Sequence, residues 1–276
     1  MLFASQHLRV TAEYGVATLW LGFPGEPVNA LDAARLNELD AALAAIETNP
    51  FIRALVVRSA KPFGFCAGLH PNVEHVTDRA SFAARGQRVL GRLGDLPFPT
   101  VAFIDGPCLG AGLELALACD YRLGVATPRT LLGFPGRFTC LGGSARLRGA
   151  IGRRAGAFVA SGATLSGREA RAAGLVDRAC CERRAKVELR TFLDELDLRP
   201  GAPERSADET GFAEERRAFA RLTTLAHEPV SAPVGVEALL ARGFVTPLEA
   251  EQMRARVAPA PAPAVGARPP ERRRAA

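Results

Sequence analysis

The stretch Asp105–Asp120, DGPCLGAGLELALACD, decides how the rest of the sequence is interpreted. Its glycines come where an apolar helix is expected to begin, so a ligand can approach the backbone closely there. The first amides of a helix have no intrahelical acceptor, and the helix dipole is positive at the same end. The segment therefore favours a site that stabilises developing negative charge. The alternative is that the glycines only allow the helix to pack closely on a strand.

A second glycine-containing loop, Phe63–His70 (FGFCAGLH), precedes this stretch. Each loop follows a short apolar run that reads as a buried strand, at Ala54–Val57 and at Thr100–Ile104. Helical periodicity separates the two units, since apolar residues recur every three or four positions after Asp32 and again from Asp78 to about Gly94. Strands that alternate with helices predict an α/β fold with a largely parallel sheet.

The chain opens with a predicted hairpin and closes with predicted helices. Residues 8–12 and 16–21 carry β-branched and apolar side chains on either side of a turn. The pattern after Tyr121–Val125 becomes helical. Ser166–Glu169 is a capping-box pattern, and the segment 212–227 is amphipathic with a charged face at Glu214–Arg217. The predicted organisation is a core at 1–180, a helical oligomerisation region at 181–257, and a disordered Ala/Pro/Arg tail at 258–276.

Composition excludes several classes of function. The formal charge of +6 falls to +2 without the four arginines beyond residue 267, so a nucleic-acid partner has little support. The most apolar region, 101–126, contains four charged side chains, which argues against a membrane span. The first residues do not resemble a secretory signal, so we expect a cytoplasmic protein. The six cysteines form no CxxC pair and indicate reduced thiols rather than disulfides or a structural metal.

Several separated motifs resemble those of the enoyl-CoA hydratase and isomerase (crotonase) family. They hold their order and spacing over roughly residues 8–180, and they are FCAGLHP (65–71), the stretch 105–123, PVNALD (27–32), GGSARL (142–147), SGREA (166–170) and GLVD (174–177). The resemblance implies a spiral core of ββα repeats followed by helices that assemble subunits into homotrimers or hexamers. It implies an acyl-CoA thioester as substrate and no permanently bound cofactor.

The resemblance also implies roles for particular residues. The backbone amides of Ala67 and Ala111 would form the oxyanion hole that polarises the thioester carbonyl. Glu114 lies three residues beyond Ala111, about one helical turn into the helix, and would exchange protons with the substrate. The alternative for Glu114 is that it only satisfies buried amides. Lys61, Ala67 and Gly68 are the candidate contacts to CoA, although an exposed loop lysine is an equally simple interpretation of Lys61.

Two departures from the family pattern bear on the reaction. The second glutamate of the hydratases would fall at Gly136, so one of the two acid/base carboxylates is missing. Such a loss costs about 10²- to 10⁴-fold in rate. His70 stands where an aspartate is common in the family. It would act either as a proton carrier or as a loop histidine that is hydrogen-bonded to nearby backbone.

Three functional hypotheses follow from this pattern. The first is an enoyl-CoA hydratase- or isomerase-type enzyme that uses Glu114 as its single acid/base. The second is decarboxylation of a malonyl-type CoA thioester, which needs an oxyanion hole but no water-holding pair. The third is a degenerate homologue that binds acyl-CoA without turnover.

Overall fold

The computed structural model describes residues 1–22, 25–62, 64–75, 78–197 and 209–225, together with residues 247, 248, 250 and 251. The expected tail at 258–276, and most of the segment that precedes it from residue 226 onward, lie outside these residues.

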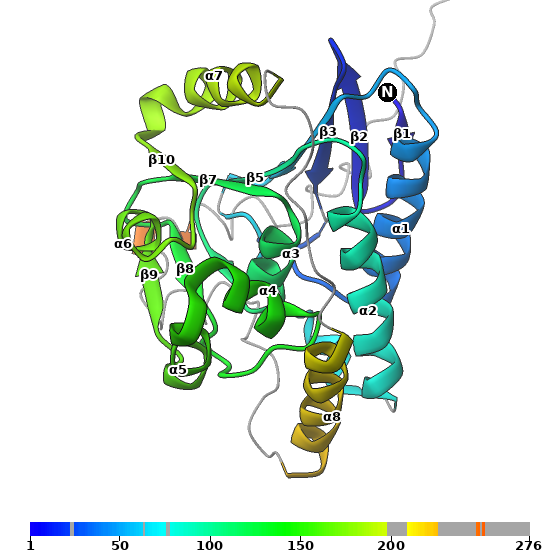
Figure 1. The fold of residues 1–276 in the computed structure, drawn as a ribbon, viewed down its shortest axis with the longest axis vertical. Coiled ribbons are helices and arrows are strands. Elements are labelled where there is room, and N and C mark those ends of the chain that lie inside the picture. The colour runs from blue at the N-terminus through cyan, green and yellow to red at the C-terminus, as the bar shows by residue number, and fades with distance from the viewer. Residues whose placement is uncertain are drawn as a thin grey trace, which may run out of the picture.

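A seven-stranded sheet forms the centre of the fold (Figure 1). Its order is β1-β2-β3-β4-β5-β7-β10, and the strands are β1 (Phe3–Ala4), β2 (Leu8–Glu13), β3 (Val16–Leu21), β4 (Ala54–Ser59), β5 (Thr100–Ile104), β7 (Tyr121–Val125) and β10 (Arg178–Cys180). The pairs from β3 onward are parallel, whereas β1, β2 and β3 pair in antiparallel fashion. The predicted hairpin and the predicted parallel arrangement are thus confirmed.

A second sheet of three short strands lies beside the first, in the order β6-β8-β9. Its strands are β6 (Cys108–Leu109), β8 (Leu131–Gly133) and β9 (Thr164–Ser166). The sequence indicated only helices beyond residue 125, so β8, β9 and β10 correct that expectation. Strands of three residues are too short to show alternation.

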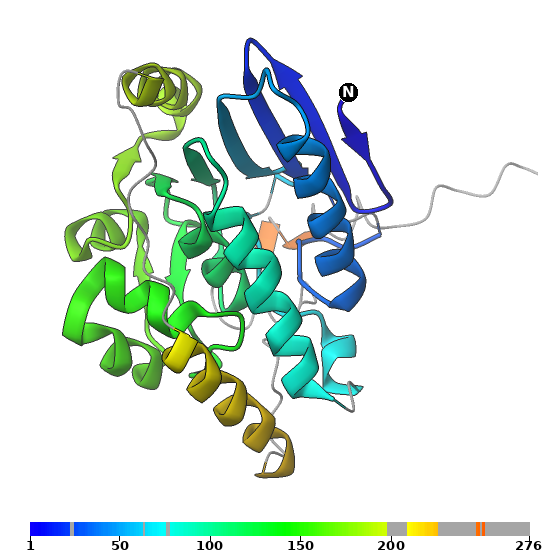
Figure 2. The same ribbon diagram turned by 45° about the vertical axis from the view of Figure 1, so that its right-hand side comes forward.

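Helices α1 (Ala33–Glu47) and α2 (Arg79–Gly94) cover one face of the large sheet (Figures 1 and 2). Asp32 and Asp78 accept hydrogen bonds from the third residue beyond each cap, Arg35 and Ser81, as the sequence predicted for Asp32. The strands alternate in the face that they serve. Leu55 and Val57 of β4 belong to the main core with α1 and α2, whereas Val56 points to the opposite face.

That opposite face is partly covered by α7 (Ala185–Asp197), whose Phe192 and Leu196 pack with Val56 and Phe103. The shorter helices are α3 (Ala111–Ala118), α4 (Gly143–Ile151), α5 (Ala155–Ser161) and α6 (Gly167–Ala173), of which α3 and α6 contact the small sheet, while α4 packs on α3 and α5. Turns of 3₁₀ helix lie at Pro71–His75, Gly152–Arg154 and Glu182–Arg184. The capping box of Ser166 and Glu169 is confirmed at the start of α6.

Helix α8 (Glu209–Leu225) packs against α2 and α4 of the same chain (Figure 2). Its Phe219 is fully buried, with its ring 6.4 Å from that of Phe82 and 5.7 Å from that of Phe138. The apolar face of the predicted amphipathic helix is therefore used within the chain. Assembly of subunits through the region 181–257 stays a prediction.

Candidate active site

The two glycine-containing loops meet at the carboxyl ends of β4 and β5. An isolated parallel bridge joins Cys66 to Cys108, and the amide of Leu109 donates to the carbonyl of Cys66 at 2.9 Å. Gly112 makes the approach possible, because a Cβ built on it would lie 2.2 Å from the carbonyl oxygen of Cys66. The glycines of the sequence pattern thus allow close packing of the two loops, and the same packing positions their amides.

The amide of Ala67 is already used inside the protein. It donates to the carbonyl of Asn29 at 2.8 Å, and the side-chain amide of Asn29 donates to the carbonyl of Phe65 at 2.9 Å. This bracing of the loop corrects the expectation that Ala67 is an oxyanion donor. The amide of Leu69, two residues further on, makes no hydrogen bond within the described residues, although the neighbouring Gly68 carbonyl and His70 amide both bond to Leu31.

The start of α3 supplies a second available amide. Gly110 has a φ of 50° and its amide donates to Gly133 at 2.9 Å, but the Ala111 amide has no acceptor among the described residues. A Cβ built on Gly68 would lie 4.0 Å from the Ala111 nitrogen, and one built on Gly110 would lie 3.8 Å from the Gly68 Cα. The structure therefore brings Ala111 beside Gly68 and Leu69, as the sequence predicted for the two loops.

Glu114 lies one turn into α3 and is 1% exposed. Its Oε1 accepts hydrogen bonds from the backbone amides of Leu141 (2.7 Å), Gly143 (2.9 Å) and Cys140 (3.0 Å). Its Oε2 has longer contacts, to the amide of Cys140 at 3.3 Å and to its thiol at 3.7 Å. Burial and the neighbouring Glu215 raise the pKa of Glu114 to about 8, against the lowering effect of the Leu141 and Gly143 amides.

Glu215 of α8 reaches the same place from the far end of the sequence. It is 5% exposed, accepts from the Gly143 amide at 3.2 Å, and accepts from the Ser144 hydroxyl at 3.1 Å. The sequence placed Glu215 on a charged outer face with Glu214, which is wrong for Glu215, because α8 turns this side chain toward the beginning of α4. The helical period does distinguish the two glutamates, because Glu215 is three residues after Phe212 and four before the buried Phe219, on the same face, whereas Glu214 is exposed.

Aromatic side chains lie next to Gly136, where the sequence comparison with the family predicts the missing carboxylate. A Cβ built on Gly136 would lie 2.7 Å from the ring of Phe138, and that ring stacks on Phe219 of α8 with an interplanar angle of 25°. Phe134 is fully buried and meets Phe158 edge to face, with ring centroids 6.2 Å apart. The absence of a second carboxylate at Gly136 is thus accompanied by an apolar wall.

His70 belongs to a polar cluster at the end of the first loop. Its Nδ1 accepts from the amide of Asn72 at 3.2 Å, which leaves Nε2 facing the Glu26 carboxylate at 3.1 Å. Arg35 bridges Glu26 and Asp32. Burial opposes ionisation of Asp32, but hydrogen bonds from the Arg35 amide and from Asn72 hold its pKa below the ordinary value. His70 thus has both a backbone and a carboxylate partner.

The sequence pattern of the family described as enoyl-CoA hydratase/isomerase matches residues 11–205, well over half of the chain. This chain belongs to the enoyl-CoA hydratase/isomerase family. It is 34% identical to the fatty acid oxidation complex subunit alpha of Vibrio campbellii over 206 residues, 71% of this chain and 29% of that protein. Identity to the subunit of the same name from Aliivibrio fischeri is 41% over 146 residues, 50% of this chain and 21% of the relative. The chain thus spans less than a third of these relatives.

Solved structures support the fold expected of the enoyl-CoA hydratase/isomerase family. An enoyl-CoA hydratase from Geobacillus kaustophilus superposes with a TM-score of 0.65 at 24% identity, covering 92% of this chain and 88% of the other. Pseudomonas aeruginosa DspI gives a TM-score of 0.65 at 26% identity, with coverage of 86% and 95%. The predicted α/β fold of the crotonase type is confirmed.

Lys61, the family-derived candidate for a CoA contact, lines a pocket of about 470 Å³ together with residues of β2, β3, β4 and β5. Trp20 lies in the wall of this pocket between two guanidinium groups, Arg9 at 5.1 Å and Arg58 at 4.7 Å from the ring centroid. Burial lowers the pKa of Lys61, while the nearby Glu26 works in the opposite direction. Three cationic side chains and the carboxyl group of Asp105 thus line a partly apolar recess, and the excess of positive charge suits a phosphate-bearing ligand.

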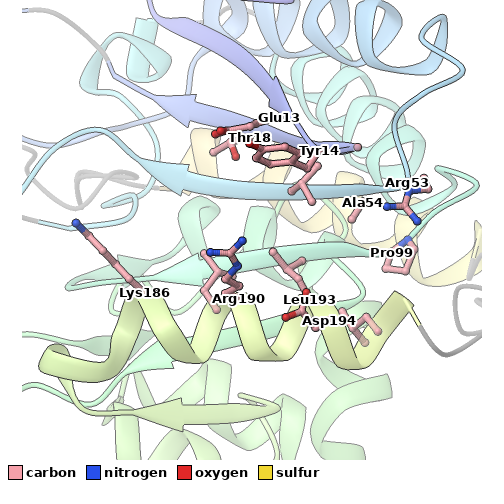
Figure 3. A pocket seen from close by; sticks show the side chains of 14 residues that line it. Glu13, Tyr14, Thr18, Arg53, Ala54, Pro99, Lys186, Arg190, Leu193 and Asp194 are labelled. Carbon is pink, nitrogen blue, oxygen red and sulfur yellow. The ribbon is translucent and has the colours of Figure 1, made fainter.

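A separate groove of about 520 Å³ runs between the β2–β3 hairpin and α7 (Figure 3). Tyr14 and Arg53 lie on one side of it, and Arg190 and Leu193 of α7 lie on the other. It contains none of the site residues that the family resemblance predicts. Within the described part of the chain there is no cluster of side chains suited to a metal ion, and none of the described helices is both long and apolar enough to cross a membrane.

Proposed function

We propose that this chain processes an acyl-CoA thioester by stabilising its enolate, with Glu114 as the acid/base group. The amides of Leu69 and Ala111, rather than those of Ala67 and Ala111, would donate to the thioester oxygen. One observation carries the proposal. Two amides without acceptors among the described residues lie on adjoining loops, and a buried carboxyl group lies one turn away on the same helix.

The electrostatics of the site support this assignment. The Ala111 amide is at the N-terminus of α3, where the helix dipole favours negative charge. Negative charge develops on the thioester oxygen only as the enolate forms, so preorganised donors stabilise the transition state more than the substrate. Each such donor contributes about 2.7–4 kcal/mol in enzymes that use it.

The protonation of Glu114 supports an acid/base role. Its pKa of about 8 lies near neutral pH, where a group both gains and releases protons effectively. Oε1 is fixed by three amides, whereas Oε2 has weaker contacts. We assign Oε2 as the atom that exchanges a proton with the α-carbon of the thioester.

The CoA moiety would extend from the loops toward the cationic recess. Lys61 is proposed to contact a CoA phosphate, and the backbone around Ala67 and Gly68 would line the path of the thioester arm. CoA acts here as part of the substrate, and no permanently bound cofactor is required. As further parts of the proposal, the enzyme works in the cytoplasm and assembles as a homotrimer or hexamer.

The aromatic wall at Gly136 favours a second candidate reaction, decarboxylation of a malonyl-type CoA thioester. Loss of carbon dioxide leaves its electron pair in the same enolate, so it needs the oxyanion hole but not a second carboxylate. An apolar wall disfavours a substrate carboxylate more than the less charged transition state. The absence of a glutamate at Gly136 also fits the third hypothesis, in which the chain binds acyl-CoA without turnover.

A panel of crotonyl-CoA, a 3-enoyl-CoA and methylmalonyl-CoA distinguishes these possibilities. We expect slow hydration of crotonyl-CoA by the wild type, and at least a 100-fold loss of α-proton exchange in Glu114→Gln, a loss on the order expected for an acid/base group. Thioester affinity should stay nearly constant, because the backbone donors remain. Glu13→Gln, an exposed carboxyl group on β2, is the matched control. Efficient hydration that Glu114→Gln leaves intact would overturn the assignment of Glu114.

A further inference from the structure

Glu114 and Glu215 meet at a single backbone amide. The N–H of Gly143 donates to Oε1 of Glu114 at 2.9 Å and to Oε1 of Glu215 at 3.2 Å. The two carboxyl groups come from α3 and α8, which are far apart in the sequence and are connected here through the start of α4. Because both acceptors share one donor, they lie within reach of each other.

Both carboxyl groups are buried, at 1% and 5% exposure. Two negative charges at this separation and depth repel strongly, so a pair of this kind retains one proton at neutral pH. The thiol of Cys140, 3.7 Å from Glu114, is itself buried, which raises its pKa well above the ordinary value and keeps it neutral. The pKa of Glu114, raised to about 8 by burial and by Glu215, is the result expected of such a pair.

The cations that pack nearby are directed to other partners. Arg146 of α4 donates to the carbonyl of Leu141 at 2.8 Å and lies 5.2 Å from the Phe212 ring. Arg216 of α8 donates to the side chain of Gln87 of α2 at 2.5 Å, and Arg79 of α2 lies 5.9 Å from the Phe219 ring. The hydrogen bonds to the pair come from the N–H groups of Cys140, Leu141 and Gly143 and from the Ser144 hydroxyl.

We propose that Glu215 is a positioning residue that shares one proton with Glu114, and that α8 thereby supplies the second carboxyl group that the chain lacks at Gly136. This inference rests on the proposed role of Glu114. With the proton on Glu215, Glu114 accepts a proton from the α-carbon of the thioester. The C–H bond breaks, the O–H bond forms, and the electron pair moves onto the thioester oxygen. The carboxyl pair changes from one negative charge to none, and return of the proton to carbon restores it.

A structural role as a helix cap is the competing explanation for Glu215. It accepts from the amide of Gly143 and the hydroxyl of Ser144, the first residues of α4, which has no side-chain cap at Gly142. Glu215→Gln keeps an oxygen for one of these two donors and removes the other acceptor oxygen, the shared proton and the charge. Glu214→Gln, an exposed neighbour on α8, is the matched control.

Infrared titration of the protonated carboxyl absorption tests the pair without any requirement for turnover. In the wild type we expect a buried carboxyl band that disappears with a midpoint near pH 8, the pKa of Glu114. Glu215→Gln should lower that midpoint by about one pH unit or more, since a like charge is removed. Ser144→Ala, a milder change, should also shift it, because the hydroxyl that donates to Glu215 is removed. Glu214→Gln should leave it in place.

Kinetics supply the second arm of the test. The pH profile of α-proton exchange should move to lower pH in Glu215→Gln, with kcat at pH 8 falling at least about tenfold and KM nearly constant. An unchanged infrared midpoint in Glu215→Gln and an unchanged midpoint in Ser144→Ala would overturn the inference and leave Glu215 as a cap. Wild-type exchange that is insensitive to Glu114→Gln would instead overturn the proposed function, whatever the infrared result.

Discussion

Replacement of Glu114 by glutamine should change how the stability of this protein depends on pH. A glutamine carbonyl oxygen can occupy the position of Oε1 and keep the hydrogen bonds from Leu141, Gly143 and Cys140. The glutamine amide then takes the place of Oε2 and gives up the longer contacts from the amide and thiol of Cys140. The variant therefore retains the three shortest hydrogen bonds and removes the titration of the carboxyl group.

The magnitude follows from the pKa of Glu114. Its value is about 8 in the folded chain, against an ordinary value of 4.5, and each unit of pKa is worth 1.36 kcal/mol. Between these two pH values the folded chain holds a proton that the unfolded chain has released, so the free energy of unfolding falls as pH rises. The full loss is about 5 kcal/mol, and at pH 7 it is about 3 kcal/mol. Glu114→Gln should not show this loss of stability as pH rises.

Thermal or urea unfolding of the wild type and Glu114→Gln, from pH 5 to pH 9, measures this difference. Between pH 5 and pH 9 the wild type should lose about 4 kcal/mol. In a domain of this size 1 kcal/mol corresponds to roughly 2–4 °C in Tm, so the variant should gain about 8–16 °C relative to the wild type across that range. Glu38→Gln is the contrasting control. Burial opposes ionisation of Glu38, but hydrogen bonds from Ser5 and His7 lower its pKa, so its contribution is lost as pH falls below about 4.5. Parallel curves for Glu114→Gln and the wild type would refute the buried, elevated carboxyl group.

Further predictions concern the packing of the loops, the aromatic wall and assembly. Gly112→Ala should lower the free energy of unfolding by about 1–3 kcal/mol, because its Cβ would lie 2.2 Å from the Cys66 carbonyl oxygen. Gly91→Ala in α2 meets no atom within 4 Å and should raise the free energy of unfolding by about 0.5–1 kcal/mol. Tm values that move in the same direction in both variants would contradict this. Gly136→Glu should not restore hydration of crotonyl-CoA unless Phe138 is also reduced to alanine, since the new Cβ would lie 2.7 Å from that ring; recovery in the single variant would disprove the steric reason. Light scattering should show a trimer or hexamer, and a stable monomer at micromolar concentration would contradict that prediction.

The fold was largely predictable because its signals are local. Asp32 caps α1 and the apolar period of that helix is visible in the sequence, while β4 and β5 appear as short apolar runs bounded by turns. The strands β8 and β9 were not predictable, since their three residues carry no period and they form only by pairing with each other and with β6. Tertiary pairing of this kind overrides local propensity.

The site was predictable only in part, because its details depend on contacts between distant segments. The motif predicts the two loops and Glu114. It does not reveal that the Ala67 amide donates to the Asn29 carbonyl, which leaves the Leu69 amide as the available donor of that loop. Glu215 was taken as part of a solvated face because neighbouring charges in a helix usually are. The spacing of Phe212, Glu215 and Phe219 places it on the apolar face of α8, but its contact with the start of α4 depends on how the two helices pack.

The way α8 closes over the site determines where this scaffold can be cut. A fragment that stops at Cys180, the boundary suggested by sequence, would lose Phe192 and leave the outer face of the central strands exposed to water. It would also lose Phe219, which is fully buried, and the carboxyl group that shares the Gly143 amide with Glu114. We therefore expect the shortest fragment of this chain that folds and keeps the site intact to extend through residue 225, with α7 and α8 included.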